Sequence, residues 1–241
     1  WVARHQALQQ PFAVKLMVPP ASTAAVQAFE GVETSLRRFK NEAQIAAVLS
    51  RKSRHIAQVT DYGIDEGAAY LVMELLEGEG LDRRIGRGRR LDPPEVSAIV
   101  SQIAKGLTVA HAEGVTHRDL KPANVFLTRT EDGELLVKLL DFGIAQMARR
   151  IVKDSDRAPT RLTMKGLVLG SPAYMSPEQA MAESPDARAD VWSLAVLAFE
   201  ALAGVGPFHG ETSDETILRI CNFKSARLVV ERVRAHALPQ T

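Results

Sequence analysis

His117-Arg118-Asp119-Leu120-Lys121-Pro122-Ala123-Asn124 is the most informative stretch of this 241-residue sequence. A helix is predicted before it, because apolar residues recur at three- and four-residue steps at Val96, Ile99, Val100, Ile103 and Leu107. The sequence Asp92-Pro93-Pro94-Glu95 provides an N-cap and an N-terminal proline for this helix, and Gly114 ends it. A predicted hairpin follows, with strands over 125–128 and 135–140 around Asp132-Gly133. We therefore expect a polar loop between a helix and a hairpin.

Two further stretches follow in order. Asp141-Phe142-Gly143 begins seventeen residues after Asn124, and Gly-Ser-Pro-Ala-Tyr-Met-Ser-Pro-Glu occupies residues 170–178. The His-Arg-Asp-x-x-x-x-Asn pattern alone would occur by chance in roughly one chain of this length in a thousand. The three stretches together resemble the catalytic loop, metal-binding loop and substrate loop of eukaryotic-type serine/threonine protein kinases, in a form similar to bacterial members.

The resemblance covers residue 2 to about residue 223 and implies an α+β, two-lobed protein-kinase-like fold. The small β-rich lobe would span residues 1–75 and the larger, mainly helical lobe residues 76–241. The strand and glycine-rich loop that open this fold are missing, since residues 1–5 resemble the strand that follows that loop. We expect the sequence to be a fragment cut at both ends.

Local patterns agree with two lobes. Strands are predicted over 12–18, 56–62 and 69–75, and a helix over 33–50 has an apolar stripe formed by Leu36, Phe39, Ala43, Ala46 and Leu49. The stretch 78–90, rich in glycine and arginine, indicates the crossing between the lobes. In the larger lobe, residues 144–169 read as a long loop and a last helix begins near Asp214. A helix over 187–203 should place Val191, Leu194, Ala198 and Leu202 inward.

The residue types suit phosphoryl transfer, which requires charge neutralisation of a triphosphate and alignment of a hydroxyl. The resemblance implies that Asp119 accepts or orients the proton of the substrate hydroxyl. Lys121 would place a positive charge on the transferring phosphate, and Asn124 and Asp141 would bind the metal. Oxygen ligands of these types suit Mg²⁺. The alternative for Asp119 and Asn124 is that they only cap a turn.

The ATP site implied by the resemblance draws on both lobes. Lys15 would bind the α- and β-phosphates and pair with Glu42 on the first helix. Met73 would stand at the back of the adenine pocket, and backbone groups of Glu74 and Leu76 would bond the purine edge. Ala13 and Phe126 would form its ceiling and floor. An apolar strand core is a compatible description of these residues.

Regulation is a further hypothesis from the resemblance. Arg118 would dock a phosphate added to the basic loop 144–168, at Thr160 or Thr163, and order that loop. The alternative is a solvated basic loop. Ser171 would line the substrate site, and Asp190 would support the catalytic loop from behind.

Composition sets the remaining limits. With 46% hydrophobic residues and a net charge of +1, the chain is neither disordered nor drawn electrostatically to nucleic acid or membranes. No membrane span is visible in the sequence, and the single cysteine, Cys221, fits a cytoplasmic location, although a longer parent protein could be membrane-anchored. We expect an ATP- and Mg²⁺-dependent kinase acting on serine or threonine of protein substrates. The alternatives are a catalytically silent, kinase-like ATP-binding or scaffold module and a small-molecule phosphotransferase of related fold.

Overall fold

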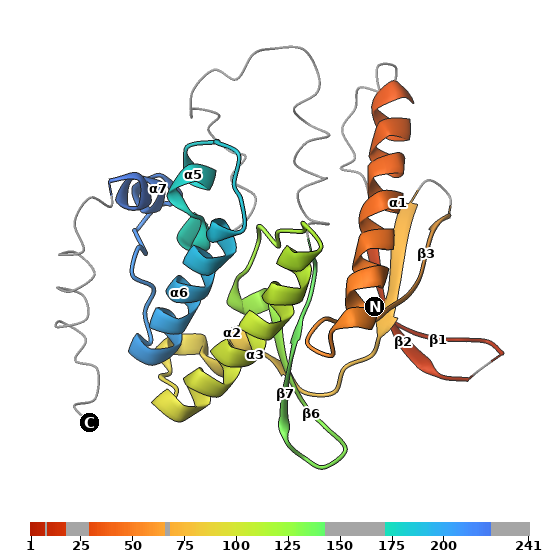
Figure 1. Cartoon of the computed structure of the whole chain (residues 1–241), viewed down its shortest axis with the longest axis horizontal. Coiled ribbons are helices and arrows are strands. Elements are labelled where there is room, and N and C mark those ends of the chain that lie inside the picture. The colour runs from red at the N-terminus through yellow and green to blue at the C-terminus, as the bar shows by residue number, and fades with distance from the viewer. Residues whose placement is uncertain (8, 18–28, 66–67, 143–171, 223–241) are drawn as a thin grey trace.

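Residues 1–7, 9–17, 29–65, 68–142 and 172–222 are described by the computed structural model of this chain (Figure 1). They form an antiparallel sheet with one long helix at the N-terminal side and a mainly helical region after it. The predicted two-lobed α+β fold is therefore observed.

The N-terminal sheet has the strand order β1-β2-β4-β3, and all its neighbouring strands are antiparallel. Its members are β1 (Val2–Arg4), β2 (Pro11–Met17), β3 (Val59–Asp65) and β4 (Ala68–Glu74). Helix α1 (Phe29–Lys52) packs on β3 and β4. The predicted apolar stripe of this helix is confirmed by the buried side chains of Phe39, Ala43, Ala46 and Leu49, whereas the Leu36 side chain lies outside the described residues.

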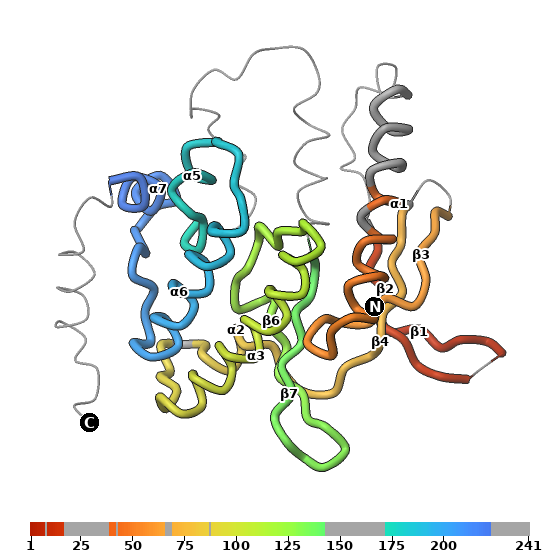
Figure 2. Tube along the Cα trace, viewed as in Figure 1, coloured from red at the N-terminus to blue at the C-terminus, as the bar shows by residue number. Residues whose placement is uncertain are grey.

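Below the sheet, the chain passes from β4 into the larger lobe through a short segment, which can be followed in Figure 2. A second antiparallel sheet has the order β5-β6-β7, with β5 at Glu79–Gly80, β6 at Val125–Arg129 and β7 at Leu135–Leu139. The helices are α2 (Leu81–Arg84), α3 (Pro93–Ala112), α5 (Pro177–Ala180), α6 (Arg188–Ala203) and α7 (Ser213–Cys221). Short 3₁₀ turns lie at Gly86–Gly88 (η1), Pro122–Asn124 (η2) and Pro172–Tyr174 (η3).

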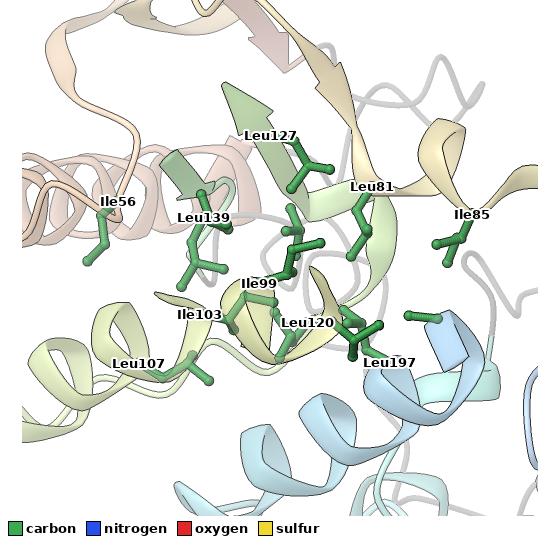
Figure 3. Close-up of a cluster of buried hydrophobic side chains, with 14 of the residues drawn as sticks. Ile56, Leu81, Ile85, Ile99, Ile103, Leu107, Leu120, Leu127, Leu139 and Leu197 are labelled. Carbon is green, nitrogen blue, oxygen red and sulfur yellow. The ribbon is translucent and has the colours of Figure 1, made fainter. Parts of the chain in front are cut away.

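The main hydrophobic core joins α2, α3, α6 and the β6–β7 hairpin (Figure 3). Leu81, Ile99, Ile103, Leu139 and Leu197 are almost completely buried in it. Burial of each such side chain contributes about 1.5–3 kcal/mol. Leu120, from the middle of the polar loop, is buried in the same core and fixes that loop to the helices.

Close packing of α3 on β7 depends on Gly106. A Cβ atom at this position would lie 2.8 Å from Leu139 Cδ1 and 3.3 Å from the His55 carbonyl oxygen. The absent side chain therefore lets the turn after α1, helix α3 and β7 meet at one place. Ile56 forms an isolated parallel bridge to Leu139 outside the strand. The strand predicted over 56–62 therefore has the wrong start, since β3 begins at Val59.

Three further local predictions were wrong or incomplete. Val191 is 60% exposed, not inward, because α6 is apolar on several faces: Leu197 packs in the main core and Val196 in a second cluster. Asp92 precedes α3 in an extended conformation, but its side chain makes no capping hydrogen bond. The stretch 78–90 is more than a crossing, since it contains β5, α2 and η1.

Candidate active site

The polar loop between α3 and β6 brings three predicted site residues together. Asp119 Oδ2 accepts hydrogen bonds from Lys121 Nζ at 2.7 Å and from Asn124 Nδ2 at 3.1 Å. Asn124 Nδ2 also donates to the Asp119 carbonyl oxygen at 2.7 Å. Because the side-chain amide nitrogen of Asn124 donates these bonds, its side-chain oxygen is the atom that can bind a cation. The η2 turn at Pro122–Asn124 brings Asn124 back toward Asp119, five residues earlier in the chain.

Lys15 and Asp141 approach one another from the two lobes. Lys15 lies in β2. Its Nζ is 2.6 Å from Oδ1 of Asp141, which lies two residues after the end of β7. Both side chains are partly exposed, at 33% and 20%. Asp141 has a φ of +58°, a strained value for a residue with a side chain, and the next residue, Phe142, is buried. Strain of this kind persists only where surrounding contacts hold it.

Leu140 connects these two groups of residues. Its backbone N–H donates to the Asn124 carbonyl at 2.9 Å, and its carbonyl accepts from His117 Nε2 at 2.9 Å. His117 is completely buried, and its ring packs against Phe142 with 4.7 Å between ring centroids. Burial lowers the pKa of His117, which agrees with a neutral ring whose Nδ1 accepts a long hydrogen bond from the Asp119 N–H at 3.4 Å.

Asp190 holds the loop from behind, as predicted. Its carboxylate has no exposed surface and accepts three hydrogen bonds: Oδ1 from the Arg118 N–H at 2.8 Å, and Oδ2 from the His117 N–H at 2.8 Å and His111 Nε2 at 2.7 Å. Arg118 has a φ of +63°. The hydrogen bonds to Asp190 offset the cost of that conformation and fix the backbone directly before Asp119.

The segment from Pro172 to Ala180 is tied to the same framework. Tyr174 donates a hydrogen bond to Glu200 Oε2 on α6 at 2.5 Å, and its carbonyl accepts from Ser193 Oγ at 2.7 Å. Burial raises the pKa of Tyr174, with the nearby Glu200 carboxylate adding to the shift. Ser176 and Gln179 form a capping box at α5, and Gln179 Nε2 donates to the Arg118 carbonyl at 2.7 Å. The candidate peptide-binding segment is thus bonded directly to the loop that carries Asp119.

Comparison with known proteins agrees with this geometry. The model of the protein kinase domain family matches residues 2–237. This chain belongs to the protein kinase family.

Its relatives include several bacterial enzymes. The chain is 39% identical over 173 residues to the serine/threonine-protein kinase pkn2 of Myxococcus xanthus, covering 72% of the chain and 20% of that protein. It is 36% identical over 211 residues to PknH of Mycobacterium tuberculosis, with 88% and 30% coverage. It is 40% identical over 181 residues to PknA of the same species, with 73% and 38% coverage. The chain therefore spans between a fifth and two fifths of the length of these relatives, and the predicted family is confirmed.

Family membership implies that this kinase domain uses ATP and a divalent metal. The part of the chain that the structure describes contains no group of three or more His, Cys, Asp or Glu side chains able to hold a metal. Asn124 and Asp141 each carry a side-chain oxygen, the ligand type that hard divalent cations prefer. Among the described residues, no helix is long and apolar enough to span a bilayer.

Two of the residues predicted for the adenine site, Ala13 and Met73, lie on the neighbouring strands β2 and β4. Ala13 is the register partner of Met73. The Glu74 N–H donates to the Gln58 carbonyl at 2.9 Å, so of its two backbone groups only the carbonyl remains a candidate for the purine edge. Leu76 follows β4, and Phe126 lies in β6 opposite Lys138.

An ion pair that sequence reasoning missed fixes this region. Glu74 Oε1 lies 2.6 Å from Lys138 Nζ and accepts from the Gln58 N–H at 2.7 Å. The Lys138 side chain is only 12% exposed. The end of β4 is therefore bonded to β7 of the other lobe. The only sequence signal was Lys138 within an otherwise apolar strand, and its partner is 64 residues away.

Some predicted residues are not placed. The backbone of Glu42 lies in α1, but its side chain is outside what the structure describes, and the Lys15–Glu42 pair stays a prediction. Thr160, Thr163 and Ser171 also lie outside the described residues. The contact the structure gives for Lys15 is with Asp141.

Proposed function

We propose that this chain is the catalytic domain of a serine/threonine protein kinase that transfers the γ-phosphoryl group of ATP to protein hydroxyls with Mg²⁺. Within it we assign residues 1–75 to the small lobe and 76–241 to the large lobe. The observation that supports the proposal is the pair of contacts Lys121–Asp119 and Lys15–Asp141, each between a cation and a carboxylate, in segments joined by the hydrogen bond from the Leu140 N–H to the Asn124 carbonyl. The relatives named as serine/threonine kinases support the choice of hydroxyl.

Asp119 is assigned to the substrate hydroxyl. Its Oδ2 is engaged by Lys121 and Asn124, so Oδ1 is the oxygen that would accept the hydroxyl proton and direct the attacking oxygen. Lys121, held beside this carboxylate, places a positive charge where the phosphoryl group would pass. Stabilisation of this kind comes from charges that are already in place before reaction.

Lys15 is assigned to the α- and β-phosphates, with Glu42 as its proposed partner. Asn124 and Asp141 would hold Mg²⁺, which would supply charge neutralisation for the phosphate oxygens. Ala13, Met73 and Phe126 would enclose the adenine, while the Glu74 carbonyl and the Leu76 backbone would bond its edge.

Regulation through Arg118 belongs to the same proposal. Among the described residues, Arg118 Nε is buried and has no hydrogen-bond partner. A phosphate on Thr160 or Thr163 carries a charge of about −1.5 to −2 and would satisfy this guanidinium. Mass spectrometry of the active protein should find phosphate at one of these threonines, and active protein without it would contradict this part. A cytoplasmic location is also proposed, supported by the single cysteine.

The test is phosphoryl transfer from radiolabelled ATP by recombinant protein containing residues 1–241. Asp119→Asn should reduce turnover by about 10²–10⁴-fold and leave nucleotide binding intact. Lys15→Met should reduce turnover by about 10²–10³-fold. The matched control is Asp132→Asn, which removes the same charge from the exposed hairpin turn and should have no effect.

Hydrolysis of the labelled product should give phosphoserine and phosphothreonine. If the protein binds ATP and transfers nothing, it is a silent kinase-like module. If Asp119→Asn transfers phosphate normally, the role assigned to Asp119 is wrong.

A further inference from the structure

A pocket separate from the residues assigned above lies at the junction of the two lobes. Its volume is roughly 450 Å³, and it is lined by three segments: the turn after α1, one face of α3 and the start of β7. Its lining includes Arg54, His55, Ser101, Gln102, Lys105 and Glu134. None of the residues assigned to ATP, metal or substrate lines it.

The wall of this pocket is held by side chain-to-backbone hydrogen bonds. Gln102 donates from Nε2 to the Leu135 carbonyl at 3.1 Å and accepts at Oε1 from the Val137 N–H at 3.0 Å. His55 Nδ1 lies 3.1 Å from the Val137 carbonyl, and the His55 side chain is buried. The His55 carbonyl accepts from the Leu139 N–H at 2.8 Å. The pocket is therefore built on a bonded framework.

The charge of the pocket is mainly positive. Arg54 and Lys105 are exposed, and within the described part of the chain neither forms an ion pair. By contrast, the neighbouring Lys52 and Lys138 are neutralised by Glu113 and Glu74. Burial lowers the pKa of His55, and the charges of Arg54, Lys105 and Lys138 lower it further. Glu134 is the only carboxylate in the lining.

We propose that this pocket binds a single phosphate monoester, with Arg54 and Lys105 as charged donors and the Ser101 hydroxyl as a neutral donor. A guanidinium matches phosphate oxygens with two parallel N–H groups. Two unpaired cations balance the charge of about −1.5 to −2 that a phosphate monoester carries. Glu134 would repel a second anionic group, so a triphosphate is disfavoured.

The pocket has room for a ligand larger than free phosphate. The volume falls within the roughly 300–1,000 Å³ of small-molecule sites, which leaves room for the group that carries the phosphate. The carrier could be an amino-acid side chain or a sugar, and both present the same phosphate chemistry to Arg54 and Lys105.

Binding can be followed at the histidine in the wall. Inorganic phosphate is titrated into the protein while the ring C–H resonance of His55 is recorded by NMR over a range of pH. A bound anion would offset Arg54 and Lys105, so the pKa of His55 should rise. Titrations with O-phosphoserine and with glucose 6-phosphate distinguish the two carriers, and the true carrier type should bind more tightly than inorganic phosphate.

Four variants separate this pocket from the rest of the protein. Arg54→Gln and Lys105→Gln should each weaken phosphate binding about ten-fold or more. Arg51→Gln removes the same charge from an exposed position three residues before Arg54 and should leave binding unchanged. Lys15→Met should also leave the His55 response unchanged.

The outcomes that would overturn the proposal are specific. Phosphate binding lost in Lys15→Met but kept in Arg54→Gln would place the anion in the nucleotide site. Equal weakening by Arg51→Gln and Arg54→Gln would show only general electrostatic attraction. The Asp119→Asn variant should bind phosphate normally at this pocket, so failure of the proposed kinase activity and failure of this inference are distinguishable.

Discussion

Asp190→Asn should destabilise this domain more than any exposed substitution near it. The Asp190 carboxylate is completely buried and accepts hydrogen bonds from two backbone N–H groups and from His111. An asparagine retains one acceptor oxygen, and its NH₂ group must then face a donor. At least one buried N–H is left unsatisfied, which costs about 1–3 kcal/mol, and the remaining bonds lose their charge assistance. We expect a total loss of about 3–5 kcal/mol in the free energy of unfolding.

This loss is measurable by urea denaturation, because single domains have unfolding free energies of about 5–15 kcal/mol. The control is Asp186→Asn, which removes the same charge from an exposed pair with Arg188 and should leave the free energy of unfolding nearly unchanged, because solvent screens such pairs. Turnover of Asp190→Asn should also fall, because the backbone N–H groups of His117 and Arg118, the two residues directly before Asp119, are bonded to Asp190. A loss for Asp190→Asn as small as that for Asp186→Asn would refute the view that Asp190 supports the catalytic loop.

Three further outcomes are expected. Tyr174→Phe should lower the unfolding free energy by about 1–3 kcal/mol, measured by urea denaturation, because it leaves the Glu200 carboxylate without its hydroxyl donor; an unchanged midpoint would contradict this. Lys138→Met should lower the unfolding free energy by a similar amount, about 1–3 kcal/mol, because the partly buried Glu74 carboxylate then keeps only the hydrogen bond from the Gln58 N–H. The double variant Lys138→Met with Glu74→Gln should regain part of this stability in thermal melting, and no regain would exclude coupling of the pair. Below about pH 6.5 the unfolded chain binds more protons than the folded domain, because the fold keeps His117 neutral. The free energy of unfolding should therefore be constant above this pH and decrease as the pH falls below it. His117→Tyr should flatten this pH dependence between about pH 8 and pH 5.5, and an equally steep dependence would assign the effect to another group.

Much of the local structure could be read directly from residue order. The apolar stripes of α1 and α3, the Asp132-Gly133 turn and the positive φ of Gly133 and Gly114 follow from helical period and turn chemistry. The polar loop could be located because its eight residues match the catalytic-loop motif of the protein kinase family. Periodicity was misleading for α6, where Val191 is exposed, because a helix buried on several sides has no single apolar stripe.

Sequence alone predicted which side chains would carry the chemistry: a carboxylate, an amide and a lysine within one short loop, and a second carboxylate after the next hairpin. Only the tertiary structure decided with whom they pair. Lys15 forms an ion pair with Asp141 across the two lobes, and Glu74 forms one with Lys138. Asp190 accepts hydrogen bonds from a loop more than 70 residues earlier in the chain. Residue order specifies conformation over a few positions, whereas these contacts form because separate elements pack into a common core, and their partners are set by that packing.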